Sequence, residues 1–184
     1  MIESLTTADG LELEALWDGP ADPEMAIVFC HPHPLHGGSM RAPLLREVTS
    51  HLNERGIAVL RFNVRGVGGS GGSHEGGVGE LLDIDAAWAA LVARVPDSRL
   101  GIVGWSFGAV TSLRWVDERE AAVPWVGIAP PVRSELTPDL PTNPARSGRK
   151  AIVIGDRDQF VTVADLAAYA GAVGAELHLS LIHI

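Results

Sequence analysis

The chain has 184 residues, of which 46% are hydrophobic and 20% charged, and its formal net charge at pH 7 is −9. This length and composition predict a single globular domain over residues 1–184 with a substantial core, which excludes a disordered chain. The acidic balance argues against nucleic acid and against an anionic membrane surface as partners, because both require a basic patch. We therefore expect a small-molecule substrate.

The first residues, "MIESLTTADG", lack the basic start and the apolar core of a secretion signal. No run of about eighteen uninterrupted apolar residues is present, as a membrane span would require. The single cysteine, Cys30, excludes an intrachain disulfide and agrees with a reducing compartment. These features predict a soluble, cytoplasmic protein.

Short apolar or β-branched runs alternate along the chain with longer segments of helical periodicity. This alternation predicts an α/β fold, in which a mostly parallel sheet is flanked by helices. Strand 11–17 alternates in polarity and is predicted to be an antiparallel edge strand. The expected elements in chain order are strands 11–17 and 26–30, helix 41–55, strand 57–62, helix 79–95, strand 99–105, helix 106–117, strands 124–129 and 150–155, helix 162–173 and strand 175–182. Helix 79–95 carries its apolar face on Leu81, Ile84, Trp88, Leu91 and Val95. The glycine-rich segment 66–79 and the proline-rich segment 130–148 are expected to be long loops of the kind that often carry function.

The sharpest motif is "GWSFG", residues 104–108, which has the pattern G-x-S-x-G. It lies between a predicted strand and a predicted helix, as a nucleophile elbow requires. In such an elbow Ser106 occupies a strained turn, and Gly104 and Gly108 are small because backbone atoms approach too closely for a Cβ. The motif therefore predicts that Ser106 is a catalytic nucleophile.

Four motifs follow one another along the chain: "HPHPLHGGSM", "LRFNVRGVGGSGG", "GWSFGA" and "GDRDQFV". With these motifs the sequence resembles the α/β-hydrolase superfamily, and within it the small, cap-less bacterial hydrolases similar to dienelactone hydrolases. The resemblance implies the α/β-hydrolase fold and hydrolysis by a serine nucleophile, without a cofactor. It also implies that Arg65 and the glycine-rich loop form one wall of the active-site entrance.

The segment "HPHPLHGG" follows strand 26–30, where the superfamily supplies half of its oxyanion hole. Pro32 and Pro34 have no N–H group, so the donor in this loop is expected to be His33, Leu35 or His36. Phe107, directly after the nucleophile, is expected to give the second N–H. The prolines can instead serve only to stiffen the loop.

Other patterns in the sequence offer competing chemistry. His31, His33 and His36 have the H-x-H-x-x-H spacing of some zinc hydrolases, but Leu35 stands where the metallo-β-lactamase pattern needs an aspartate. We expect no metal.

His51 and His74 are expected to be solvated and not catalytic. The G-x-G-x-x-G pattern that begins at Gly66 does not lead directly into a helix, so it does not predict a dinucleotide site. Cys30 is expected to be a small buried hydrophobe.

Asp156 and Asp158 follow strand 150–155, at the edge where this fold assembles its site. The resemblance aligns Asp158 with the acid of a catalytic triad, while Asp156 is expected to form the turn; a solvated turn without a catalytic role is the alternative. The catalytic histidine should come after the last strand. His178 lies within that strand, which leaves His183 as the candidate. His183 has no loop to bring it over Ser106, so we expect a C-terminally truncated reading frame whose terminal "SLIHI" is not native, and a 184-residue chain that is nearly inactive.

Three interpretations follow from these patterns. The favoured one is a serine hydrolase that acts on a small ester, thioester or lactone through an acyl-enzyme, with Ser106, Asp158 and His183 as the triad. The second is a metal-dependent hydrolase at His31, His33 and His36. The third is a non-catalytic binding protein on the same fold.

Overall fold

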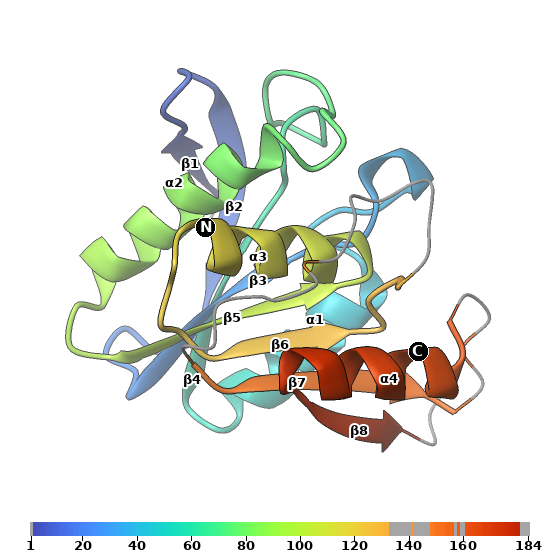
Figure 1. The fold of residues 1–184 in the computed structure, drawn as a ribbon. Helices are drawn as coiled ribbons and strands as arrows, with labels where there is room; N and C mark the ends of the chain where they lie inside the picture. Colours follow the sequence, from blue (N-terminus) through green and yellow to red (C-terminus); the bar gives the residue numbers. More distant parts are fainter. Residues whose placement is uncertain (1, 133–140, 142–147, 157, 159–160, 181–184) are drawn as a thin grey trace.

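The computed structural model describes residues 2–132, 141, 148–156, 158 and 161–180. Its described strands form one eight-stranded sheet in the order β1-β2-β4-β3-β5-β6-β7-β8 (Figure 1). The strands from β4 to β8 in this order are parallel, while β1 and β2 are antiparallel to their neighbours. The predicted mostly parallel sheet with flanking helices is therefore confirmed. The strands are β1 (Ile2–Thr6), β2 (Glu12–Asp18), β3 (Met25–Cys30), β4 (Ile57–Phe62), β5 (Arg99–Trp105), β6 (Trp125–Ile128), β7 (Lys150–Gly155) and β8 (Glu176–Ser180).

The prediction that segment 11–17 is an edge strand is wrong. It forms β2, which pairs with β4 on one side and with β1 on the other, so that β1 is the edge of the sheet. In β1 only Leu5 is buried, and Leu5 lies opposite Leu13 of β2. A strand with a single buried side chain has no polarity alternation to detect, and for this reason the sequence pattern did not reveal it.

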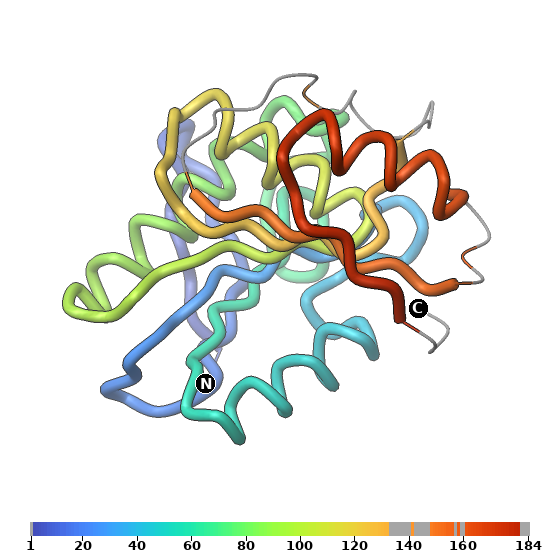
Figure 2. Tube along the Cα trace, turned by 60° about the horizontal axis from the view of Figure 1, so that its bottom comes forward, coloured from blue at the N-terminus to red at the C-terminus, as the bar shows by residue number. Residues whose placement is uncertain are grey.

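Helices cover both faces of the sheet, but unequally (Figure 2). The larger core joins α2 (Glu80–Arg94), α3 (Phe107–Glu118) and α4 (Val163–Val173) to one face of the strands. Among the described helices, α1 (Pro43–Asn53) packs on the other face, where Leu45 meets Ile27, Phe29 and Val59. The residues of β3 alternate between these two cores, as the period of two in a strand requires.

The helix ends follow local chemistry. The predicted helix 41–55 begins at Pro43 because proline fits the first helical position, where its missing N–H has no role. Helix α4 begins after Thr162, whose hydroxyl accepts the N–H of Asp165 at 3.1 Å, and it ends at Gly174 in the left-handed conformation. No helix in the described ranges is long and apolar enough to cross a membrane.

Three backbone hydrogen bonds join neighbouring strands just beyond their carboxyl ends. Ser106 N–H donates to Ile128 O at 2.8 Å, Ala129 N–H to Val153 O at 2.7 Å, and Asp156 N–H to Ser180 O at 2.9 Å. They connect the turn after β5 with the ends of β6, β7 and β8. The residues that follow these strands are therefore held side by side along one edge of the sheet.

Candidate active site

Ser106 occupies the turn between β5 and α3 with φ 52° and ψ −117°. Positive φ is strained for a residue with a side chain and costs on the order of 1–3 kcal/mol, so the surrounding structure must enforce it. A Cβ on Gly104 would lie 2.3 Å from Gly108 O, and one on Gly108 would lie 2.4 Å from Cys30 O. The crowding predicted for this turn is confirmed.

The hydroxyl of Ser106 does not cap the helix that it precedes. Ser106 is the N-cap residue of α3, a position where serine commonly accepts a helix N–H, yet its side chain makes no capping hydrogen bond. Phe107 N–H is the first amide of α3, so it has no intrahelical partner. The turn thus combines a hydroxyl that caps no helix, a terminal N–H and the positive end of a helix dipole.

The loop after β3 forms a short 3₁₀ helix, η1 (Pro34–His36), that the sequence did not predict. Within it Leu35 N–H donates to His33 Nδ1 at 3.2 Å, and His36 N–H donates to His33 O at 3.1 Å. The backbone donors of Leu35 and His36 are therefore engaged inside the loop, and the Leu35 side chain is 73% exposed.

His31 links the oxyanion loop to the end of β4. Its ring is 1% exposed, its Nε2 accepts the N–H of Val64 at 3.2 Å, and its Nδ1 lies 2.6 Å from Pro32 O. Nδ1 therefore carries the proton, and both ring nitrogens have partners. Burial lowers the pKa of His31 to about 4, so the ring is neutral near pH 7.

The proposed metal cluster does not assemble around these histidines. Both nitrogens of His31 are engaged, and Nδ1 of His33 accepts the N–H of Leu35. Within the described ranges, no group of three or more His, Cys, Asp or Glu side chains is arranged to hold a metal ion. Cys30 is buried, as expected, and burial raises the pKa of its thiol far above the usual range.

The two aspartates after β7 have different surroundings. Asp156 is exposed, and its backbone N–H donates to Ser180. Asp158 is half-buried, and its Oδ1 accepts the N–H of Val161 at 2.9 Å, so this carboxylate contributes to the turn after β7. Asp158 nevertheless lies at the carboxyl edge that also holds Ser106.

His183, the candidate base, lies outside the described residues. His178 is in the middle of β8 opposite Val153, and its side chain is 58% exposed beside Glu176. It is therefore remote from the carboxyl edge, as expected. Ser180 ends β8 opposite Gly155, so the chain leaves this strand next to the turn that carries Asp158.

Arg65 does not form a wall of the entrance, contrary to expectation. Its side chain is 2% exposed, and it donates to Asp83, which is fully buried, at 2.9–3.0 Å and to Glu75 at 2.8 Å. Its backbone N–H also donates to Asp83 at 2.8 Å, and Asp9 lies 3.1 Å away. Arg65 thus ties the glycine-rich loop to α2 and to the turn after β1.

His74 is packed rather than solvated, which corrects the second expectation for this loop. Its side chain is 12% exposed. The centroid of its ring lies 5.3 Å from the ring centroid of Phe107 and 5.1 Å from that of His33. Its Nδ1 lies 2.5 Å from Oε1 of Glu80, although the ring is not oriented for a hydrogen bond. A histidine among glycines gave no signal of this contact, because it depends on how the loop folds back onto α3.

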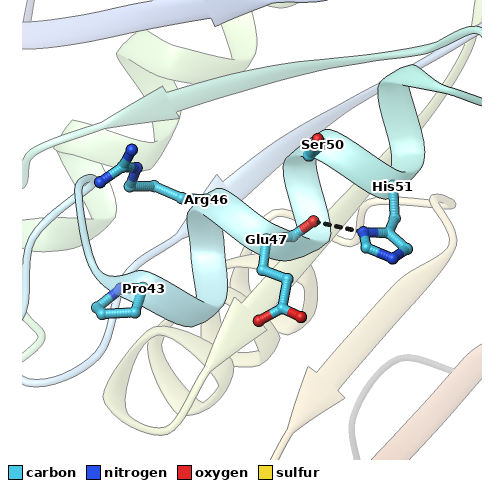
Figure 3. A pocket seen from close by; sticks show the side chains of 5 residues that line it. All are labelled: Pro43, Arg46, Glu47, Ser50 and His51. Atoms are coloured by element: carbon cyan, nitrogen blue, oxygen red, sulfur yellow. Dashed lines mark hydrogen bonds between the residues drawn. The ribbon is translucent and has the colours of Figure 1, made fainter.

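A surface hollow of about 430 Å³ lies along α1 (Figure 3). It is lined by Pro43, Arg46, Glu47, Ser50 and His51. All five belong to one helix, and His51 is exposed, with its Nδ1 3.0 Å from Glu47 O. The expected exposure of His51 is confirmed, and none of the residues that line the hollow belongs to the elbow.

Comparison with known proteins gives consistent matches. Residues 22–175 match the model of the family described as serine aminopeptidase, S33. An uncharacterized protein of Rickettsia prowazekii, RP471, is 34% identical over 143 residues, which cover 77% of this chain and 60% of that protein. The chain thus aligns with less than two thirds of that relative's length.

Solved structures show the same fold. An α/β serine hydrolase homologue from Coxiella burnetii is 30% identical with a TM-score of 0.82, covering 98% of this chain and 87% of that one. The protein XC6422 from Xanthomonas campestris, an α/β serine hydrolase without a lid, is 29% identical with a TM-score of 0.80, covering 97% and 82%. These relatives do not bear on the finer resemblance to dienelactone hydrolases. The chain belongs to the serine aminopeptidase S33 family of α/β hydrolases.

Proposed function

We propose that this protein is a serine hydrolase of the esterase or acyl-hydrolase type, which acts on a small ester, thioester or lactone. The observation that carries the proposal is the backbone of Ser106, which has positive φ at the amino end of α3 while its hydroxyl caps nothing. Strain of this kind persists only where the surrounding structure enforces it, and it is concentrated at functional sites.

The reaction proceeds through an acyl-enzyme. Ser106 Oγ attacks the carbonyl carbon and passes its proton to a histidine, the tetrahedral intermediate collapses, and the leaving group departs with that proton. Water then attacks the acyl carbon, with the same histidine as base, and Ser106 regains its proton. The N–H groups of Phe107 and His33 stabilise the oxyanion in both steps.

Asp158 is the acid that orients the histidine in this proposal. Its place after β7 and its half-buried carboxylate support the role, and the end of β8 beside it supports a base from the following segment. His183 is the histidine that this sequence has after β8. The Xanthomonas structure has no lid, which supports an openly accessible active site here. A small molecule is the partner in this proposal, as the substrate.

The test is substitution of the nucleophile. In the full-length native protein, Ser106→Ala should reduce hydrolysis of p-nitrophenyl acetate on the order of a millionfold and abolish labelling by a fluorophosphonate probe, because no other group replaces the nucleophile. Ser50→Ala, on the exposed side of α1, is the matched control and should retain both. Full activity of Ser106→Ala, lost to a chelator, would instead support the metal-dependent interpretation, and wild-type protein without hydrolysis or labelling would support the binding protein.

A further inference from the structure

We propose that His74 is a positioning residue of the oxyanion hole, acting through Phe107 and His33. The inference rests on the proposed function, because it concerns the two residues whose N–H groups are assigned to the oxyanion. His74 itself is assigned no contact with the substrate.

The three rings form a closed triangle. The ring centroids of His33 and Phe107 are 5.1 Å apart, those of His33 and His74 are 5.1 Å apart, and those of His74 and Phe107 are 5.3 Å apart. These are the separations of edge-to-face or tilted aromatic pairs, each of which adds stabilisation beyond burial. Each ring comes from a different loop: the one after β3, the elbow after β5 and the glycine-rich loop after β4.

The triangle joins both halves of the oxyanion hole. His33 is 9% exposed and Phe107 is 1% exposed, so both rings have little room to move independently. Packing between them fixes the distance between the oxyanion loop and the start of α3. His74 closes the triangle from the third side, so that removing its ring would leave the other two without support there.

Glu80 anchors His74 to the scaffold. It is the first residue of α2, its side chain is fully buried, and its carboxylate accepts the N–H of Gly77 at 2.7 Å and that of Glu75 at 2.9 Å. The same carboxylate lies 2.5 Å from His74 Nδ1. The loop that carries His74 is thus hydrogen-bonded to a carboxylate at the start of α2, and these contacts fix the position of the ring.

This arrangement predicts a loss in kcat rather than in KM. The oxyanion forms only in the transition state, so misplaced N–H donors slow the chemical step and leave ground-state binding intact. Removal of a whole donor costs about 10²–10³-fold in kcat, so a displaced pair of donors should cost about 10- to 100-fold. His74→Phe keeps a ring of similar shape and should restore most of that loss.

The experiment compares His74→Ala, His74→Phe and the remote control His51→Ala in steady-state hydrolysis of p-nitrophenyl acetate. The expected result is a 10- to 100-fold lower kcat for His74→Ala with KM within about threefold of wild type, and a kcat for His74→Phe within about threefold of wild type. His51→Ala should match wild type. Thermal unfolding of each variant shows that the compared proteins are folded at the assay temperature.

Three results would overturn the inference: an unchanged kcat in His74→Ala, a loss expressed mainly in KM, or a His74→Phe variant as slow as His74→Ala. The last would mean that the imidazole acts through a property that phenylalanine lacks, such as its contact with Glu80, and not through ring packing alone. The proposed function fails separately, and this inference with it, if the wild type neither hydrolyses the ester nor reacts with a fluorophosphonate at Ser106.

Discussion

The two sides of the carboxyl edge are built in different ways. On the nucleophile side, the buried polar groups His31, Arg65 and Glu80 each bind partners from another loop or helix. On the acid side, Asp158 is half-buried, and its turn is connected to β8, an edge strand whose residues are half-buried or exposed. The neighbouring strands there are joined by backbone hydrogen bonds at their ends.

The difference shows that the fold holds the nucleophile side in place with buried polar contacts, whereas it positions the acid side mainly through the backbone. A buried polar group that loses its partner costs far more than an exposed one, so the nucleophile side resists rearrangement. The acid side carries little of that penalty. We therefore expect substitutions on the acid side to change chemistry with little change in stability, and substitutions around Arg65 to do the opposite.

Within the comparison of the two sides, the largest effect on activity should come from Asp158→Asn. Replacing the acid of a serine-hydrolase triad favours the wrong imidazole tautomer and costs on the order of 10⁴-fold in kcat. Asparagine keeps an oxygen that can accept the N–H of Val161, so the turn and the melting temperature should change little. The measurement is kcat for p-nitrophenyl acetate together with thermal unfolding.

The matched variant is Asp156→Asn, two residues earlier and exposed. It should retain kcat within a few-fold of wild type, because its side chain is assigned no catalytic contact. Equal losses in the two variants would remove the assignment of Asp158 as the acid. A large drop in stability for Asp158→Asn would show that the acid side is as tightly built as the nucleophile side.

Arg65→Met should produce the largest loss of stability among these variants. It leaves the fully buried carboxylate of Asp83 without its guanidinium partner, and breaking a buried pair in this way costs about 3–5 kcal/mol. Chemical denaturation followed by tryptophan fluorescence measures the change. Arg149→Met, at the amino ends of β7 and β8, is the control: its ion pair with Glu176 joins side chains that are 87% and 63% exposed, so its loss should be barely measurable. Comparable losses would contradict the contrast between a buried and an exposed ion pair.

The smallest effect is a pH dependence that originates at His31. Its pKa is about 4 in the folded protein against 6.5 for an ordinary histidine, so between these values the unfolded chain binds the extra proton. The free energy of unfolding should therefore fall as the pH falls from about 6.5 to 4, by up to about 3 kcal/mol, and this contribution should be constant above pH 6.5.

His31→Gln provides the comparison for this pH dependence. Glutamine can accept the N–H of Val64 but does not titrate, so the difference in unfolding free energy between wild type and variant should depend on pH only in that window. Urea titrations at several pH values measure it. A constant difference between pH 4 and 7 would show that His31 does not titrate in the predicted way.

The sequence itself determined the features that depend on neighbouring residues. The alternation of apolar runs and helical periodicity indicated the parallel sheet, and only the terminal strand β1, with one buried side chain, escaped it. The elbow could be predicted because glycine at positions 104 and 108 reflects a steric requirement within one strand–turn–helix unit. Ser106 and Asp158 could be placed at one edge of the sheet because each follows the carboxyl end of a predicted parallel strand.

Only the tertiary structure decided which polar side chains are buried and which face solvent. Arg65 and His74 lie in or beside the same glycine-rich loop. Both are packed, contrary to the expectation, because that loop folds back against α2, the oxyanion loop and α3. Likewise, the sequence could not show that the N–H groups of Leu35 and His36, two of the candidate oxyanion donors, are engaged by His33 within the loop. Periodicity and backbone sterics are local properties of a sequence, whereas the burial and pairing of a polar group depend on distant segments that cover it.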